Sequence, residues 1–271
     1  MKIIDRGGGT AIVVIPGVQG RWEWMRPAID TLAQHCRVIT FSLADEPTSR
    51  YAFDEQRGIG CFVDQVRDAL DKAGLSKAAI CGVSYGGLIA AAFAARHPDR
   101  VSSLVLVSAI PPSWEPDGRV RFYLKAPWLL SPLFCIGSLR MYPEIAAANP
   151  GLIAGARAAI RHAGRVLTHL FSPGRMARRV RLLQGAGLQK ELAGLSVPTL
   201  VVTGDPALDR VVPVRLTHEY IRMWPHAHVA SIAHTGHLGL ITRPDEFARI
   251  VVPFAENAAR QTDSASRRRI G

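Results

Sequence analysis

The chain alternates short apolar runs, rich in β-branched residues, with longer stretches of helical spacing. The apolar runs are Ala11 to Ile15, Arg37 to Leu43, Ala78 to Val83, Val101 to Ala109, Thr199 to Thr203 and His228 to Ile232. Strands that are buried on both faces have this nearly continuous apolar character, and a helix after each strand brings the next one in parallel. We therefore expect an α/β fold with a doubly wound, mostly parallel sheet.

The alternation is interrupted in the middle of the chain. Between Ile110 and Gly194 the sequence has Ala-rich and Leu-rich helical patterns broken by prolines, and no clear strand. We expect a core of residues 1–110 and 196–260, with a helical cap insertion at 111–195 over the carboxyl edge of the sheet. The segment 261–271 is small and polar, which predicts a disordered basic tail.

The formal net charge of +11 first suggests a nucleic-acid partner. However, Pro112 to Leu195 holds 12 basic and 4 acidic residues, the segment from Arg260 holds 4 and 1, and the remainder holds 17 of each sign. No nucleic-acid motif accompanies the charge, so we expect no nucleic-acid partner. The alternatives are an anionic substrate, or peripheral contact of the basic cap with an anionic membrane surface.

The basic run in the cap contains Arg175, Arg178, Arg179 and Arg181. The default interpretation is a solvated helix face, and the alternatives are binding of an acidic substrate group or of anionic lipid headgroups. No stretch of about 18 uncharged apolar residues is present to span a bilayer. Residues Met1 to Gly9 lack the apolar core of a signal peptide, so the expected location is cytoplasmic.

The motif Gly82-Val83-Ser84-Tyr85-Gly86-Gly87 lies between a predicted strand and a predicted helix. Small residues two positions before and after a serine permit a tight strand-to-helix turn, and the helix N-terminus favours developing negative charge there. This context indicates a nucleophilic serine. The alternative is a serine that caps the helix, with glycines that serve only the turn.

A serine hydroxyl needs a base, and the base needs an orienting acid, on loops after later strands. His237 follows the run that ends at Ile232. Two aspartates, Asp205 and Asp209, follow the run Thr199 to Thr203, so both are candidates for the acid.

With these residues in this order, the chain resembles the α/β-hydrolase superfamily, in particular its esterase-like and lipase-like serine hydrolases with a helical cap. The resemblance rests on the motifs GVSYGG, AAFAARHPDRVSSLVLVSA, VVTGDPALDRVVP and AHTGHLGLITRPDEF. It implies that Ser84 is the nucleophile and His237 the general base. The family places a proline four residues after its acid, as Pro213 follows Asp209, which favours Asp209 over Asp205.

The resemblance also implies an oxyanion hole made by the backbone N–H groups of Val18 and Tyr85. Relatives usually carry His-Gly before the first donor, whereas this chain has Pro16-Gly17. The implied chemistry is cofactor-free acyl transfer through an acyl-enzyme, with a small or medium apolar ester, thioester or lactone as substrate.

Aromatic side chains are candidates for the substrate pocket. They are Trp22, Trp24, Trp128 and Phe134. For Trp22 and Trp24, anchoring of the first helix is an equal alternative, and the apolar stretch around Trp128 and Phe134 is also explained by cap packing. The histidines near His237 lack nearby acidic or thiol ligands, so we expect no metal.

Three rival functions stay open at this stage. Acyl transfer to another acceptor and carbon–carbon bond hydrolysis use the same three side chains. A ligand-binding protein that keeps the fold without turnover is the rival that the altered oxyanion loop favours.

Overall fold

The computed structural model describes residues 1–132, 138–149, 151, 153, 155–157, 160–161, 164, 168–169, 171–184 and 187–268. In this part of the chain the strands form one seven-stranded sheet in the order β1-β3-β2-β4-β5-β6-β7. The strands are β1 Ile4–Arg6, β2 Ala11–Ile15, β3 Arg37–Thr40, β4 Ala78–Val83, β5 Val101–Val107, β6 Thr199–Thr203 and β7 His228–Ser231. β1 pairs antiparallel with β3, and every other pairing is parallel. The predicted mostly parallel α/β sheet is confirmed.

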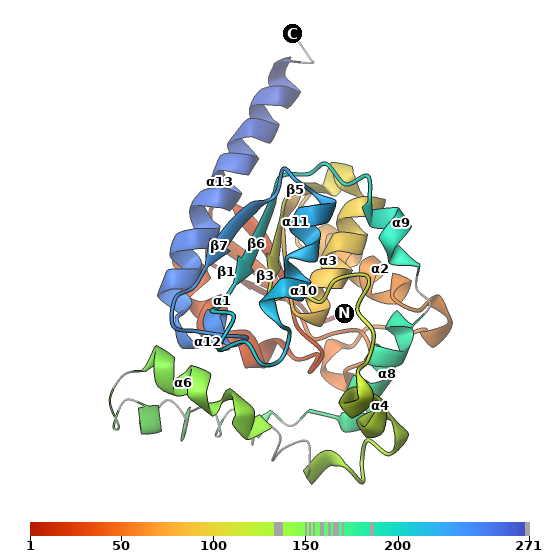
Figure 1. Cartoon of the computed structure of the whole chain (residues 1–271). Helices are drawn as coiled ribbons and strands as arrows, with labels where there is room; N and C mark the ends of the chain where they lie inside the picture. The colour runs from red at the N-terminus through yellow and green to blue at the C-terminus, as the bar shows by residue number, and fades with distance from the viewer. Residues whose placement is uncertain are drawn as a thin grey trace.

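Helices cover both faces of this sheet (Figure 1). The helices are α1 Arg26–Leu32, α2 Gly60–Lys72, α3 Tyr85–Arg96, α4 Gly118–Lys125, α6 Tyr142–Ala148, α8 Pro173–Leu183, α9 Leu188–Leu192, α10 Val214–Thr217, α11 Glu219–Met223, α12 Gly239–Thr242 and α13 Pro244–Arg268. Short 3₁₀ turns occur at η1 Trp22–Met25, η2 Pro47–Ser49, η3 Glu55–Arg57, η4 Pro98–Arg100 and η5 Ser138–Met141. One apolar core packs under α2, α3 and α9, and the other packs under α1, α12 and α13.

Burial explains which elements form where. β4 and β6 are buried along their whole length, and α3 is buried from Tyr85 to Ala94 because it lies against the sheet with no polar face. β7 is largely exposed because it is the last strand of the sheet. The parallel strands therefore all end at one edge, and the loops after β2, β4, β6 and β7 meet there.

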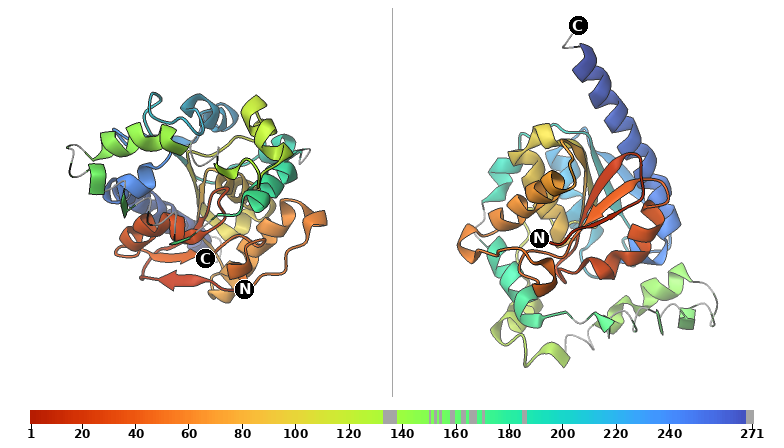
Figure 2. Two further views of the ribbon diagram at one scale, coloured as in Figure 1. Left: turned by 90° about the horizontal axis from the view of Figure 1, so that it is seen from below. Right: turned by 180° about the vertical axis from the view of Figure 1, so that it is seen from behind.

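The segment between β5 and β6 contains helices and no strand where the structure describes it; α4, α6 and α8 lie along one edge of the sheet, and α9 lies beside α3 (Figures 1 and 2). We call residues 111–195 the insert. Its helix α6 packs against α12, and its helix α9 packs against α3. The insert therefore contacts the core through both of these helices.

The C-terminal segment differs from the predicted disordered tail. Helix α13 continues to Arg268 and projects past the body of the molecule (Figure 1). The hydroxyls of Thr262 and Ser264 donate to the carbonyls of Ala258 and Arg260, at 2.9 Å each, so these polar residues are accommodated by back-bonding to the helix. Residues 269–271 lie outside the described residues.

Candidate active site

Ser84 lies at a sharp turn between β4 and α3. Its backbone has φ 54° and ψ −116°, a region that residues other than glycine rarely adopt. The turn is held by three backbone bonds: the Ser84 N–H donates to Val107 at 2.8 Å, and its carbonyl accepts from Gly87 at 3.0 Å and Ile110 at 3.3 Å. Such strain persists only where the surroundings fix it, and it concentrates at functional sites.

The loop after β2 packs directly on this turn. A Cβ on Gly86 would lie 2.5 Å from the Pro16 carbonyl oxygen, so no side chain fits there. A Cβ on Gly17 would lie 3.5 Å from the Cβ of Ser84. The glycines of both segments therefore allow the loop that carries Val18 to sit beside the serine.

The two predicted oxyanion donors lie in these segments. Tyr85 is the first residue of α3, so its N–H is one of the helix donors without an intrahelical acceptor. Among the described contacts, no acceptor is recorded for the Val18 N–H. The Val18 carbonyl accepts a hydrogen bond of 2.7 Å from Nη1 of Arg179, which restrains the loop from the other side.

Asp209 and His237 are in contact. Nδ1 of His237 lies 3.4 Å from Oδ2 of Asp209, and both side chains are buried. Oδ1 of Asp209 accepts from the N–H groups of Val211 and Val212 at 3.1 and 3.0 Å. Burial opposes ionisation of Asp209, but the His237 contact and the two N–H groups outweigh it and lower the pKa of Asp209 below its usual value. An ionised Asp209 can orient the imidazole and stabilise its protonated form.

Asp205 has a different role. Its Oδ2 accepts from the N–H of His234 at 2.7 Å, and its own N–H donates to the carbonyl of Thr235 at 2.7 Å. His234 has a positive φ of 58°, so Asp205 holds the turn that precedes His237. The structure thus brings Asp209, and not Asp205, to the imidazole.

Ser84 and His237 share the carboxyl edge of the sheet, each about 8% exposed. Within the described residues no hydrogen bond joins the Ser84 hydroxyl to His237. Such a catalytic contact is commonly long in a substrate-free site and tightens when substrate binds.

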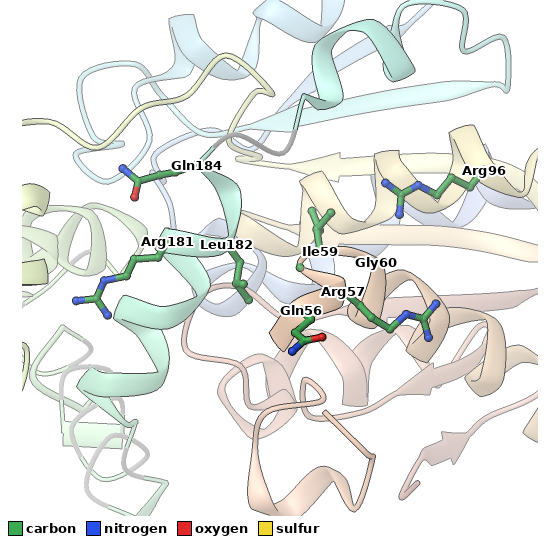
Figure 3. Close-up of a pocket in the computed structure, with 9 residues that line it drawn as sticks. Gln56, Arg57, Ile59, Gly60, Arg96, Arg181, Leu182 and Gln184 are labelled. Atoms are coloured by element: carbon green, nitrogen blue, oxygen red, sulfur yellow. The ribbon is translucent and has the colours of Figure 1, made fainter. Parts of the chain in front are cut away.

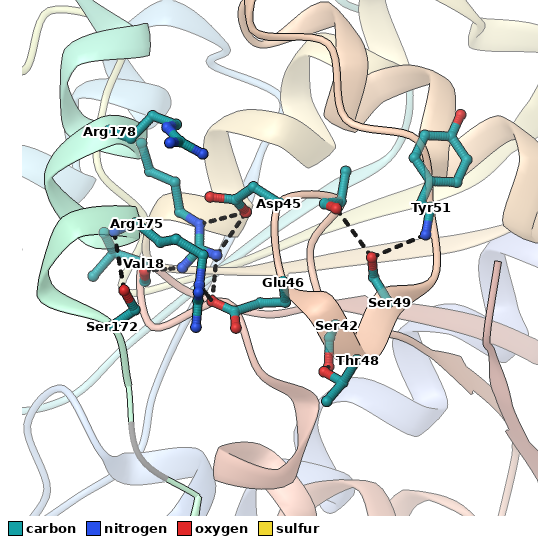
Figure 4. A network of polar contacts seen from close by, with 12 residues as sticks. Val18, Ser42, Asp45, Glu46, Thr48, Ser49, Tyr51, Ser172, Arg175 and Arg178 are labelled. Atoms are coloured by element: carbon teal, nitrogen blue, oxygen red, sulfur yellow. Dashed lines mark hydrogen bonds and ion pairs between the residues drawn. The ribbon is translucent and has the colours of Figure 1, made fainter.

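The expectation of a solvated face for the basic run of the insert is wrong for Arg179 and holds for Arg181, which is exposed. Arg179 is 0% exposed, and its guanidinium donates to Asp45 at 2.6 and 2.9 Å and to Glu46 at 2.6 Å. Arg175 donates to Glu46 at 3.1 Å, and Figure 4 shows both carboxylates facing α8. Arg178 pairs with Glu55 at 3.4 Å. Arg175 and Arg179 therefore anchor α8 on the loop after β3, where Asp45 and Glu46 face them although these residues are far away in the sequence.

Glu144 is a site residue that the sequence did not single out. It is 1% exposed on α6, and its Oε1 accepts from the N–H of Leu238, next to His237. Burial raises the pKa of Glu144 to about 7, although the N–H groups of Gly236 and Leu238 and the nearby His237 favour its charged form. The one sequence signal is an acidic residue within a helix that is otherwise apolar and Ala-rich.

The predicted pocket aromatics are scattered. Nε1 of Trp24 donates to the carbonyl of His169 at 3.0 Å, and its ring meets Phe171 edge-on at 6.2 Å, so it joins η1 to the insert. Trp22 lies under the guanidinium of Arg6 of β1, which is 5.6 Å from the Trp22 ring centroid. Trp128 is 66% exposed, which argues against a place in an enclosed pocket. The prediction for Phe134 lies outside the described residues.

A cavity of about 380 Å³ lies away from this site (Figure 3). It is lined by Gln56, Arg57, Gly58, Ile59, Gly60, Arg96, Arg181, Leu182 and Gln184. The guanidinium groups of Arg57 and Arg96 are paired with Asp64 and Glu191, so they do not stand free to bind an anion. We assign it no role in the chemistry.

Two features of the described residues bear on the class of site. No cluster of three or more His, Cys, Asp or Glu side chains is placed to hold a metal ion. No helix in the described ranges is long and apolar enough to cross a bilayer.

Comparison with known proteins gives consistent matches. The model of the alpha/beta hydrolase family matches residues 12–250. A 2-hydroxymuconate semialdehyde hydrolase from Pseudomonas sp. (strain CF600) is 28% identical over 262 residues, which cover 94% of this chain and 89% of that protein. A pimeloyl-[acyl-carrier protein] methyl ester esterase from Aliivibrio salmonicida is 27% identical over 256 residues, with coverage of 89% and 90%.

Among solved structures, the enol-lactonase from Burkholderia xenovorans LB400 superposes with a TM-score of 0.76 at 22% identity. The match covers 93% of this chain and 95% of that one. At this identity the likeness supports the fold. The family match over most of the chain, together with the strained serine turn and the order of the strands, shows that the chain belongs to the alpha/beta hydrolase family.

Proposed function

We propose that the protein is a serine hydrolase that forms an acyl-enzyme on Ser84. The observation that carries the proposal is the buried contact between Asp209 and His237, on loops that end at the same sheet edge as the strained turn of Ser84. The relatives support hydrolysis as the reaction class, since they are named as hydrolases and esterases. The specific residue roles are our assignment.

In this mechanism His237 accepts the proton of the Ser84 hydroxyl while the oxygen attacks a carbonyl carbon. The N–H groups of Val18 and Tyr85 donate to the oxyanion of the tetrahedral intermediate. The protonated His237, stabilised by Asp209, then returns the proton to the leaving group, and the acyl group remains on Ser84. A water molecule deprotonated by His237 repeats these steps and releases the acid.

We propose a small or medium apolar ester, thioester or lactone as substrate. The names of two matched proteins, a methyl ester esterase and an enol-lactonase, support this class. Hydrolysis of a carbon–carbon bond is the alternative favoured by the match to a 2-hydroxymuconate semialdehyde hydrolase. Acyl transfer and ligand binding without turnover would use the same site.

The test is turnover of p-nitrophenyl esters of increasing chain length by the parent and by Ser84→Ala. We expect hydrolysis by the parent and a loss of at least about 10³-fold in the variant, the order seen when a triad member is removed. Phenyl-substituted 2-hydroxy-6-oxo-dienoates test the carbon–carbon alternative in parallel. Absence of turnover of all these compounds by the parent would contradict the hydrolase and leave the binding protein as the better account.

We also propose that the insert contacts an anionic membrane surface. Phe122, Trp128 and Leu129 are 48%, 66% and 80% exposed, and Arg119 and Arg121 are exposed nearby in the chain. Exposed aromatic and apolar side chains among cations suit an interface of this kind. The pairing of Arg175, Arg178 and Arg179 with carboxylates removes those three from such a contact.

Co-sedimentation with phosphatidylglycerol vesicles, and with phosphatidylcholine vesicles as the neutral comparison, tests this contact. We expect binding to the anionic vesicles that is weakened by salt and by Trp128→Ser. Equal retention by both kinds of vesicle, or none by either, would contradict it.

A further inference from the structure

Glu144 connects the insert to the loop of His237. Helix α6 packs on α12, the helix that follows His237 in the chain, and Figure 1 shows the two side by side. From α6 the carboxylate of Glu144 reaches the loop and accepts from the N–H of Leu238, with the N–H of Gly236 as a second donor. These two peptide groups flank His237 on either side.

The charge of Glu144 acts on the imidazole. The charges with an effect on Glu144 are those of His237, which favours its ionised form, and Asp209, which opposes it. Among the described residues, Arg140 belongs to η5, which contacts α6, and Arg243 follows α12, the other helix in contact with α6. Because the side chain is 1% exposed, water screens this interaction little.

An ionised carboxylate buried in this position lowers the stability of the folded protein. Burial raises the pKa of Glu144 to about 7, so near neutral pH the folded protein holds this group partly ionised at the expense of stability. A glutamine would fill the same volume and could accept the N–H of Leu238 through its amide oxygen without that cost. Functional sites commonly carry such destabilising groups.

We propose that Glu144 is a positioning residue for His237, supplied by the insert: it fixes the loop through the two flanking N–H groups and places a second negative charge beside the imidazole. This inference rests on the proposed function. Asp209 holds the ring through Nδ1, whereas Glu144 holds the backbone that carries the ring. Both carboxylates stabilise the imidazolium that forms while Ser84 is attacking. The insert is therefore part of the catalytic machinery and not merely a cover.

The experiment compares Glu144→Gln with the parent, and with Glu115→Gln as the matched control. Glu115 is an exposed glutamate of the same insert, so its change removes one charge without touching the site. At pH 8 we expect kcat of Glu144→Gln to fall about tenfold, equal to about 1.4 kcal/mol, with KM little changed. The shape of the kcat/KM pH profile should change, because a group with a pKa of about 7 no longer titrates beside the imidazole.

Two further measurements separate this role from a structural one. Thermal unfolding at pH 8 should show Glu144→Gln to be at least as stable as the parent. The Glu144→Asp variant, which keeps the charge on a shorter side chain, should recover part of kcat. Equal kcat and an equal pH profile for Glu144→Gln and Glu115→Gln would overturn the proposal, as would a fall in kcat matched by a fall in the unfolding temperature.

Failure of the proposed function would look different. In that case the parent itself shows no ester turnover and Ser84 does not react with a fluorophosphonate. The contact between Glu144 and His237 is then still tested by NMR of the histidine ring signals. At pH 8 those signals should differ between Glu144→Gln and the parent, and identical signals would contradict the contact.

Discussion

Arg179→Met is expected to destabilise the protein strongly. The substitution removes a guanidinium that is 0% exposed and leaves the carboxylates of Asp45 and Glu46, both buried, without this partner. Breaking one side of a buried ion pair costs about 3–5 kcal/mol, because the remaining charge is uncompensated. Part of the cost at Glu46 is offset by Arg175, so the lower half of that range is the better expectation.

Urea unfolding followed by circular dichroism measures this change. A loss of about 3 kcal/mol corresponds to a fall in the unfolding temperature of roughly 10 °C for a chain of this size. Arg222→Met is the matched control, since its side chain is 69% exposed and lies 3.8 Å from Glu219, an arrangement worth less than about 1 kcal/mol.

A second variant tests the reason for the loss. If uncompensated charge is the cause, adding Asp45→Asn and Glu46→Gln to Arg179→Met should recover part of the stability. The reasoning is refuted if Arg179→Met and Arg222→Met unfold at the same urea concentration. It is also refuted if the triple variant is less stable than Arg179→Met by the sum of the losses that Asp45→Asn and Glu46→Gln cause singly.

Three other predictions concern the site. Asp209→Asn should lower kcat of ester hydrolysis by about 10³- to 10⁴-fold, because the imidazole loses its orienting charge. Asp205→Asn should keep kcat within about tenfold of the parent and should chiefly lower stability. Equal losses of kcat in the two variants would contradict the assignment of the acid. Gly86→Ala should displace the oxyanion loop, since the added Cβ would lie 2.5 Å from a backbone oxygen of that loop, and lower kcat by roughly 100-fold, the value of one oxyanion donor; unchanged kcat would show that the loop does not contribute. The pKa of Glu144 is about 7 in the folded protein and near 4.5 in the unfolded chain, so the folded state retains a proton between these pH values and the stability of the parent falls as pH rises through this window. The unfolding free energy of Glu144→Gln should therefore exceed that of the parent by near zero at pH 4 and by about 3 kcal/mol at pH 8. A difference independent of pH would refute this.

The sequence predicts the sheet well because each buried parallel strand can be recognised from its own short apolar run. The bounds of β4 and β6 match the apolar runs Ala78 to Val83 and Thr199 to Thr203. The predicted strand Arg37 to Leu43 is too long, since only Arg37–Thr40 pairs in the ladder and the chain then turns into the loop of Asp45. The apolar pattern indicates which residues are buried, and the residues after Thr40 remain buried although they no longer pair with the neighbouring strand.

The site is predictable where a motif fixes the backbone and unpredictable where distant segments meet. The turn at Ser84 follows from local sequence, whereas the choice of Asp209 over Asp205 follows from the family resemblance; the structure has the strained turn at Ser84 and brings Asp209 to His237. The burial of Arg179 depends on Asp45, 134 residues away, so a helix pattern alone reads as a solvated face. Glu144 lies 94 residues from Leu238, and no local pattern could indicate that contact.

The central claim is that Ser84 is the nucleophile. The most direct measurement is peptide mass mapping after reaction with a fluorophosphonate, carried out on the parent and on Ser84→Ala. We expect a single stoichiometric phosphonyl adduct on the peptide that contains Ser84, and no adduct in Ser84→Ala. An unreacted parent, or an adduct on another residue that persists in the variant, would contradict it.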